Sequence, residues 1–215
     1  PFEELLAIPE MSREGEKVAI IGGGPAGLAA AYHAQKHGLQ ATVFEKRETL
    51  GGIVRNVIPG FRIGDDAIDN DIALIKKTGA EFVMGKEAPD VKELKAMGFD
   101  YIVLACGAEK KGRLNIEGNV MNVIDFLYAF KNGGELKLGR NVAVVGGGNT
   151  AMDAARAAKR AEGVEKVTLV YRRNRRYMPA DLEELELAIE DGVEFMELAS
   201  PVKQANGKLV CNKMK

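Results

Sequence analysis

Short apolar runs alternate along the chain with segments in which apolar residues recur three or four positions apart. Apolar runs bounded by glycine or polar residues are typical of strands in a parallel sheet, and the second spacing is typical of helices. The runs predict strands over residues 17–21, 41–46, 80–85, 101–107, 141–146, 166–173 and 193–198. Helices are predicted from the turn after Ile21 to Gly38, and over residues 65–77, 90–97, 125–131, 149–162 and 179–192. We expect the strand at 101–107 to be fully buried.

The alternation of strands and helices begins twice, once at Lys17 and again near Asn141. This pattern predicts an α/β protein with two tandem Rossmann-like, doubly wound units built on parallel sheets. The predicted boundaries are an N-terminal extension 1–16, a first unit 17–115, a connector 116–139 and a C-terminally incomplete second unit 140–215. The last residues, "NGKLVCNKMK", predict a hairpin whose second strand has just begun. We therefore expect the sequence to be a fragment of a longer polypeptide.

Composition and charge exclude several classes of protein. The net charge is -1 with 28% charged residues, which favours neither a nucleic acid nor an anionic membrane as partner. No apolar run approaches the roughly 18 residues of a membrane span. The two cysteines, Cys106 and Cys211, lie far apart, which excludes a disulfide framework, a zinc ribbon, a local iron–sulfur ligand run and a C-x-x-C pair. We therefore expect the protein to reside in a reducing cytoplasm.

A glycine-rich turn, "GGGPAG", follows the first predicted strand. It fits G-x-G-x-x-G, in which Gly22 permits the tight turn, Gly24 lets a pyrophosphate approach, and Gly27 allows close helix–strand packing. Pro25 suits the first helical turn, whose free N–H groups attract phosphates. Glu45 ends the next strand, where a carboxylate accepts hydrogen bonds from a ribose diol. We predict dinucleotide binding over two alternatives, a turn that only packs and a site for another nucleotide such as S-adenosylmethionine.

A second turn, "GGGNTA", follows the strand predicted over 141–146 and fits the related pattern G-x-G-x-x-A. We expect Asn149 or Thr150 to cap the helix that begins there. A single dinucleotide-binding fold needs only one such turn. The second turn therefore predicts a second dinucleotide site.

The strand after the second turn ends in Tyr171, Arg172 and Arg173 instead of an acid. A guanidinium can pair bidentately with a 2′-phosphate, which an acid would repel. This end therefore predicts NADP(H) in preference to NAD(H). The alternative, a solvated basic loop, is the interpretation we prefer for Arg175 and Arg176.

Three single residues have simpler explanations than redox chemistry or metal binding. Cys106 is expected to be a small buried residue at a strand end, because free cysteine packs as a small hydrophobe. His33 and His37 have the spacing of a metal pair on a helix, but no third ligand is evident nearby. We expect both on a helix surface, and we assign no catalytic residue and no metal ligand.

Five stretches in order carry a resemblance to one family: "GGGPAGLAAA", "FEKRETLGG" followed by "IPGFR", "YIVLACGA", "VVGGGNTAMDAARAAKR" and "VTLVYRRNRRYMPA". Together they resemble the glutamate synthase small-subunit (beta) family of FAD- and NAD(P)H-dependent oxidoreductases. That family also includes the flavin module of dihydropyrimidine dehydrogenase and selenate reductase subunits. The resemblance covers nearly the whole chain from Lys17.

By this resemblance the first unit holds FAD and the second holds NADPH. The implied FAD contacts are Gly22, Gly24, Pro25, Ala26, Gly27, Glu45, Lys46, Gly51, Gly52, Arg62 and Gly107. The implied NADPH contacts are Gly147, Gly148, Asn149, Thr150, Arg172 and Arg173. Gly22 to Gly27 would lie at the FAD pyrophosphate, and Glu45 would bind the adenosine ribose.

The activity that the resemblance implies is electron transfer. In this family NADPH passes hydride to FAD, and the flavin releases electrons to iron–sulfur clusters and an electron-accepting catalytic subunit. This sequence lacks the family's cysteine-rich region, so we expect the clusters elsewhere in the parent protein or in its partner. It also lacks the family's later segment with a Gly-Asp turn near the flavin, and we expect the fragment to be inactive alone.

The residues leave other functions open. One is a nucleotide-binding interaction or sensor module without its own catalysis. Another is an ordinary single-Rossmann dehydrogenase or methyltransferase, against which the second glycine turn argues. The related disulfide reductases need a redox cysteine pair, which is absent from this sequence, so that branch is disfavoured.

Overall fold

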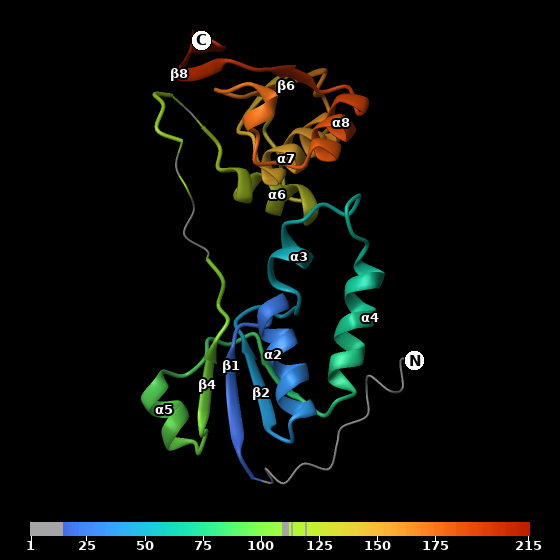
Figure 1. The fold of residues 1–215 in the computed structure, drawn as a ribbon, viewed down its shortest axis with the longest axis vertical. Helices are drawn as coiled ribbons and strands as arrows, with labels where there is room; N and C mark the ends of the chain where they lie inside the picture. Colours follow the sequence, from blue (N-terminus) through green and yellow to red (C-terminus); the bar gives the residue numbers. More distant parts are fainter. Residues whose placement is uncertain (1–14, 109–111, 113, 119) are drawn as a thin grey trace. The chain divides into compact units, whose positions relative to one another are not determined.

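The computed structural model describes residues 15–108, 112, 114–118 and 120–215. These residues form two compact units, the first with residues 15–56 and 60–108, the second with residues 57–59 and the described residues from 112 onward. Strands and helices alternate in each unit, which confirms the predicted α/β class (Figure 1). The predicted N-terminal extension lies almost wholly outside the described residues.

The first unit is built on a parallel four-stranded sheet in the order β3–β2–β1–β4. Its strands are β1 (Lys17–Ile21), β2 (Gln40–Glu45), β3 (Glu81–Met84) and β4 (Tyr101–Leu104). Its helices are α2 (Pro25–Lys36), α3 (Gly52–Asn56), α4 (Asp65–Lys76) and α5 (Val91–Ala96). Ile21 pairs with Phe44 on one side and Leu104 on the other, so three strands end together at one edge of the sheet.

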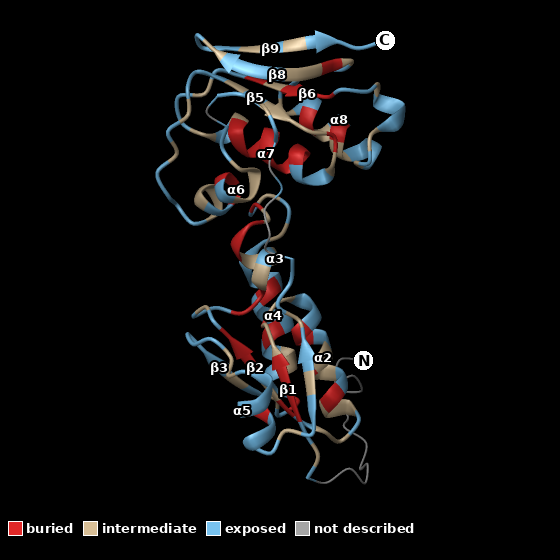
Figure 2. Cartoon of the chain, turned by 90° about the vertical axis from the view of Figure 1, so that its left-hand side faces the viewer, coloured by how far each residue is buried: buried red, intermediate tan, exposed pale blue. Residues whose placement is uncertain are grey.

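Helices cover both faces of this sheet, which makes the unit doubly wound. On one face, Ile20 and Val43 pack against Ala31 of α2. On the other face, Phe44 packs against Leu94 of α5. Successive strand residues point to opposite faces, so the neighbours Val43 and Phe44 belong to different cores. Burial of each large apolar side chain contributes about 1.5–3 kcal/mol to the stability of the fold. The central strands β1 and β2 are largely buried (Figure 2).

Strand β4 differs from the prediction of a fully buried strand at 101–107. It ends at Leu104 and lies at the edge of the sheet, with Leu104 70% exposed. Cys106, predicted to be buried, is exposed. Both expectations are wrong because an apolar run indicates a strand but not whether a second neighbour covers it.

The second unit contains a parallel three-stranded sheet in the order β5–β6–β7 and an antiparallel hairpin, β8–β9. Its strands are β5 (Asn141–Val145), β6 (Lys166–Val170), β7 (Glu194–Met196), β8 (Ala199–Ala205) and β9 (Lys208–Lys213). Its helices are α6 (Val123–Lys131), α7 (Asn149–Arg160), the 3-10 helix η1 (Arg175–Tyr177) and α8 (Leu182–Glu190). Helix α7 packs against β5 and β6 and contacts both α6 and α8 (Figure 2).

Two elements of the second unit end at other residues than the sequence predicted. Strand β6 ends at Val170, so the arginines after Tyr171 belong to a loop. The hairpin at the end of the sequence is confirmed, but its second strand pairs with β8 from one end to the other, from Lys208 opposite Ala205 to Lys213 opposite Ala199, with a shift of register between Pro201 and Lys203.

An ion-pair cluster joins α7 to the end of α8. Asp191 accepts hydrogen bonds from Arg156 Nε at 2.6 Å and from the two Nη atoms of Arg160 at 2.6 and 2.9 Å. These bonds, led by those from Arg160, lower the pKa of the Asp191 carboxyl to about 2. The cluster therefore fixes two helices of this unit to each other by charge as well as by apolar packing.

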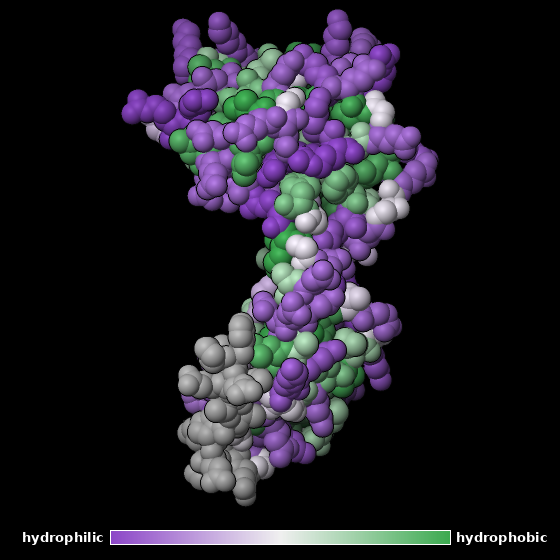
Figure 3. Space-filling view, turned by 90° about the vertical axis from the view of Figure 1, so that its right-hand side faces the viewer, coloured by the Kyte–Doolittle hydropathy of each residue, from purple (hydrophilic) through white to green (hydrophobic). Residues whose placement is uncertain are grey.

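No helix among the described residues is long and apolar enough to cross a membrane. The face seen in Figure 3 carries hydrophilic side chains over most of its area, with apolar ones scattered among them. Scattered apolar side chains are ordinary on protein surfaces and mark no binding face by themselves.

Candidate dinucleotide-binding sites

The first glycine turn lies at the carboxyl edge of the first sheet, between β1 and α2. Gly22 has a φ of +112°, and its N–H donates to Phe44 O at 2.8 Å. A Cβ at Gly22 would lie 2.4 Å from Ala105 O, and a Cβ at Gly27 would lie 1.8 Å from Gly22 O. Neither position has room for a side chain, so the turn requires glycine at both.

The loop at Gly51 and Gly52 lies directly against this turn. Gly51 N–H donates to Gly23 O at 2.8 Å, and a Cβ at Gly52 would lie 2.8 Å from Gly24 Cα. In contrast, a Cβ at Gly24 would meet nothing closer than Gly52 Cα at 3.8 Å. Packing within the protein does not demand glycine at position 24, and its presence there fits close approach by a ligand.

Glu45 covers the turn from the end of β2. The residue is 6% exposed, and its Oε2 accepts the N–H of Gly23 at 2.7 Å while Oε1 accepts the N–H of Arg47 at 2.9 Å. An ionised carboxylate has about four acceptor positions, so these two bonds leave capacity for ribose hydroxyls. Its bond to the turn was not predicted from the sequence, because strand spacing alone does not show which amide a carboxylate meets.

The other predicted contacts of the first unit lie at its surface. Pro25, Ala26, Lys46, Arg62 and Gly107 are all exposed. Ala105 N–H donates to Ile21 O at 2.8 Å, which brings the segment after β4 beside the glycine turn. Arg62 lies in a separate loop between α3 and α4, and its contact with FAD stays a prediction.

The second glycine turn repeats the first between β5 and α7. Gly146 N–H donates to Val170 O at 3.1 Å, as Gly22 does to the matching strand in the first unit. Ala151 takes the place of the last glycine, and a Cβ on Gly146 would lie 3.0 Å from the Ala151 Cβ. A Cβ on Gly148 would meet no atom within 4 Å, so this position is open to a ligand.

Asn149 joins this turn to the segment before α8. Its Nδ2 donates to Asp181 Oδ2, and its Oδ1 accepts the Asp181 N–H, both at 3.1 Å. Nearby, Ala180 N–H donates to Gly147 O at 2.9 Å. The helix has the preceding glycine as its N-cap and no side-chain cap, so the prediction that Asn149 or Thr150 caps it is wrong. Sequence reasoning missed Asp181 because it lies 32 residues away.

Tyr171 lies at the strand end that corresponds to Glu45. The residue is 8% exposed, and a Cβ on Gly147 would lie 2.5 Å from its ring. Its hydroxyl donates to Tyr177 O at 2.6 Å. The sequence marked Tyr171 only as the residue before the arginines, since no pattern shows what an aromatic ring will cover.

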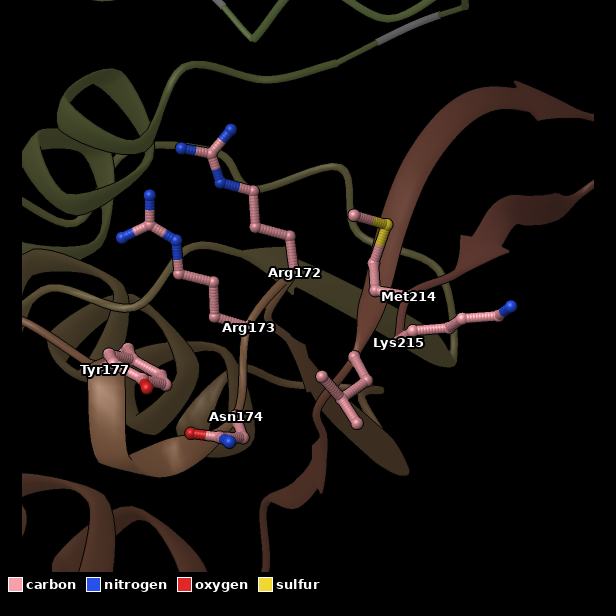
Figure 4. A pocket seen from close by; sticks show the side chains of 7 residues that line it. Arg172, Arg173, Asn174, Tyr177, Met214 and Lys215 are labelled. Carbon is pink, nitrogen blue, oxygen red and sulfur yellow. The ribbon is translucent and has the colours of Figure 1, made fainter.

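Arg172 and Arg173 lie beside a hollow of about 400 Å³. Both are exposed, and their side chains extend to the same side of the loop (Figure 4). The hollow is also lined by Asn174, Tyr177, Leu198, Met214 and Lys215. In the part of the chain that the structure describes, neither guanidinium has a carboxylate partner. Adjacent unpaired guanidinium groups suit a phosphate dianion.

The remaining candidates lie on the surface, as expected. Arg175 and Arg176 are exposed, although Arg175 N–H donates to Glu197 Oε2 at 2.7 Å. His33 and His37 are exposed on α2 and at its end. Within the described residues, no three histidine, cysteine or acidic side chains gather in a way that could hold a metal ion.

The fold and the two turns define a class of protein with two dinucleotide-binding units in tandem. The sequence matches the family described as pyridine nucleotide-disulphide oxidoreductase over residues 16–213, and the chain belongs to this family. Its two cysteines, Cys106 and Cys211, are both free thiols.

The relatives include subunits of NADPH enzymes. YgfK of Escherichia coli (strain K12), named as an oxidoreductase, is 45% identical over 212 residues, 96% of this chain and 20% of the relative. The NADPH-Fe(3+) oxidoreductase subunit beta of Geobacter sulfurreducens (strain DL-1 / KN400) is 39% identical over 85% of this chain and 29% of the relative. The glutamate synthase [NADPH] small chain of Azospirillum brasilense is 34% identical over 88% of this chain and 43% of the relative. The chain thus spans less than half of each, and its resemblance to the glutamate synthase small-subunit family is confirmed.

Solved structures share the fold. A 2-naphthoyl-CoA reductase in complex with 2-naphthoyl-CoA has a TM-score of 0.76 at 22% identity, covering 97% of this chain and 32% of that chain. FprA from Mycobacterium tuberculosis in complex with NADPH has a TM-score of 0.71 at 18% identity, covering 92% and 66%. Thioredoxin reductase from T. acidophilum has a TM-score of 0.62 at 13% identity, covering 93% and 76%. These likenesses confirm the predicted two-dinucleotide-binding flavoprotein fold.

Proposed function

We propose that this chain is the nucleotide-binding part of an NADPH-dependent flavoprotein oxidoreductase, with FAD in the first unit and NADPH in the second. The observation that carries the proposal is a difference between two matching turns. One turn is followed by the buried carboxylate of Glu45, the other by the exposed guanidinium groups of Arg172 and Arg173. A carboxylate suits a free ribose diol, and paired guanidinium groups suit a 2′-phosphate. The two units therefore suit two different adenine dinucleotides.

The residues of the first unit fit FAD. Gly24 has room that the protein's own atoms do not use, and the start of α2 offers free backbone N–H groups to a pyrophosphate. Glu45 keeps acceptor capacity beside the turn. The proposed contacts are those predicted from the sequence, with the first unit taken as residues 17–115.

The residues of the second unit fit NADPH. Gly148 is open, α7 begins immediately after it, and the two arginines stand at the end of the next strand. The proposed contacts are Gly147, Gly148, Asn149, Thr150, Arg172 and Arg173, with the unit taken as residues 140–215. The side chain of Asn149 is engaged with Asp181, so we assign its role to the backbone N–H at the helix start.

The chain's contribution is binding and orientation. When bound, the nicotinamide and the flavin supply the hydride and electron transfer themselves. The backbone turns hold the pyrophosphates, Glu45 and the arginines select the nucleotide, and no side chain is proposed as a catalytic acid, base or nucleophile.

We further propose that the electrons go on to iron–sulfur clusters elsewhere in the parent protein or in an electron-accepting partner subunit. Two relatives named as a subunit or small chain of NADPH enzymes support this proposal. The free thiols of Cys106 and Cys211 fit a reducing cytoplasm as the compartment.

The test uses the full-length parent protein, purified under mild conditions. We expect the absorbance spectrum of a bound flavin and reduction of ferricyanide with NADPH at least about tenfold faster than with NADH, since one lost charge-assisted contact is worth that much. Arg176→Ala is the matched control and should leave this preference unchanged. A protein that carries no flavin and oxidises no NADPH would refute the proposal. Binding of NADPH without any flavin would instead indicate an interaction or sensor module.

A further inference from the structure

Tyr171 and Glu45 occupy the same position in the two units. In the first sheet Ile21 pairs with Phe44, the residue before Glu45, and in the second Val145 pairs with Val170, the residue before Tyr171. In both units the first glycine of the turn donates its N–H to the carbonyl of that preceding residue, at 2.8 and 3.1 Å. A tyrosine therefore stands where the first unit has its ribose-binding acid.

The tyrosine is held on several sides. Its ring lies on Gly147, where a Cβ would come within 2.5 Å of it. Its N–H donates to Met196 O at 2.9 Å, and its carbonyl accepts the Ala199 N–H at 3.1 Å. Only 8% of the residue's surface is exposed, so the surrounding atoms restrict the ring beside the glycine turn.

From this fixed ring, the hydroxyl reaches the arginine loop, which we define as residues 172–178. It donates to Tyr177 O at 2.6 Å, at the end of η1. Within the loop, Arg176 N–H donates to Asn174 Oδ1 at 3.1 Å and Met178 N–H donates to Arg175 O at 3.2 Å. Two further bonds join its first half to the segment after β7, from Arg175 N–H to Glu197 Oε2 at 2.7 Å and from Leu198 N–H to Arg173 O at 3.3 Å. Tyr171 is thus a side chain that contacts both the glycine turn and the arginine loop.

We propose that Tyr171 is a positioning residue that determines nucleotide specificity, by fixing the arginine loop relative to the glycine turn and by denying this strand end a carboxylate. The inference rests on the 2′-phosphate site of the proposed function. A pyrophosphate and a 2′-phosphate belong to one molecule, so their sites must keep a constant separation. The hydrogen bond from Tyr171 to Tyr177 holds the second half of the loop to the ring that lies on Gly147, while a nucleotide without the 2′-phosphate does not depend on that separation.

The first experiment removes one hydroxyl group. Tyr171→Phe keeps the ring on Gly147 and removes the hydroxyl, so the unit should keep its thermal unfolding midpoint. Calorimetry of the full chain with adenosine 2′,5′-bisphosphate should show roughly three- to tenfold weaker binding, in line with one lost hydrogen bond. Binding of 5′-AMP should change less than about twofold. Tyr128→Phe, which alters a half-exposed tyrosine on α6, is the matched control and should change neither.

The second experiment needs no nucleotide. Amide hydrogen exchange of the arginine loop should rise in Tyr171→Phe and stay unchanged in Tyr128→Phe, since the N–H groups of Arg176, Tyr177 and Met178 depend on the loop keeping its shape. Equal losses for the two probes, no loss for either, or unchanged exchange in the loop would overturn the inference. The proposed electron transfer is judged by flavin and by ferricyanide reduction, so its failure is distinguishable from a failure here.

Discussion

At the residue scale, Glu45 and Tyr171 occupy matching positions and pack against matching glycine turns with different side-chain chemistry. Each covers the middle glycine of a turn, Glu45 by accepting the N–H of Gly23 and Tyr171 by laying its ring on Gly147. Because an uncharged ring can do what a carboxylate does, the charge beside the turn can change from negative to positive while the turn is kept. Under the proposed function, selection between two dinucleotides depends on a few side chains at one strand end.

The first prediction concerns the arginines at that end. Arg172→Ala or Arg173→Ala should weaken NADPH binding about tenfold or more and leave NADH binding nearly unchanged, because a hydrogen bond to a charged group contributes about 1.5–3 kcal/mol. Calorimetry with both nucleotides measures this, with Arg176→Ala as the control in the same loop. Equal losses for NADPH and NADH would show that the arginines are only a solvated basic loop.

At the element scale, helix α7 supports the proposed second nucleotide site. Its N-terminus follows the glycine turn, and its buried face is made largely of alanines, Ala154, Ala155, Ala157 and Ala158. Small side chains let β5, β6, α6 and α8 approach closely, which holds the helix start in place. The ion pairs of Asp191 with Arg156 and Arg160 add a fixed link between α7 and α8.

The second prediction concerns that link and its dependence on pH. The folded pKa of Asp191 is about 2, below its ordinary value, so its contribution is complete above about pH 5 and is lost as the pH falls through 4 towards 2. Asp191→Asn should lower the free energy of unfolding by about 1–2 kcal/mol at pH 7, after allowance for partial exposure, and by less at about pH 3.

Urea unfolding at the two pH values measures this difference. The control is Glu194→Gln, which breaks a pair with Lys166 whose side chains are 57% and 51% exposed. Such an exposed pair should contribute less than about 0.5 kcal/mol. An Asp191→Asn effect that does not change with pH would contradict the ion-pair explanation.

At the scale of the whole molecule, the chain is two compact units, each with its own parallel sheet and its own glycine turn. Each unit buries its own apolar residues, so damage to one core should leave the other intact. The two proposed nucleotide sites are built from residues of separate units, and each can be tested without the other.

The third prediction uses this separation. Gly27→Ala should destabilise the first unit by about 3 kcal/mol, because its Cβ would lie 1.8 Å from Gly22 O. Gly24→Ala has room, should cost less than about 1 kcal/mol, and should still hinder FAD. Thermal unfolding, flavin content and binding of adenosine 2′,5′-bisphosphate are the measurements. Weaker binding of that probe to Gly27→Ala would contradict the independence of the units.

Much of the fold and of the two sites was predictable because its causes are local. Gly22 and Gly27 require glycine for backbone reasons that a short motif records. Glu45, at the end of β2, and Arg172, two residues after the end of β6, stand at fixed spacings from the turns. The exposure of β4 was not predictable, since an apolar run has the same sequence pattern in an edge strand as in a central strand. The cap expected at Asn149 or Thr150 failed because Gly148 holds the N-cap position and both residues lie inside the helix, where Asn149 bonds Asp181 instead.

The sequence by itself determined the α/β alternation, the two glycine turns and the opposite charges that follow them, because each depends on residues close together in the chain. The tertiary structure alone decided that Tyr171 covers Gly147, that Asn149 pairs with Asp181, and that Arg172 and Arg173 flank an open hollow. These contacts join segments that are separate in sequence and meet only when strands pair and helices pack. Their geometry depends on packing, which no local pattern encodes.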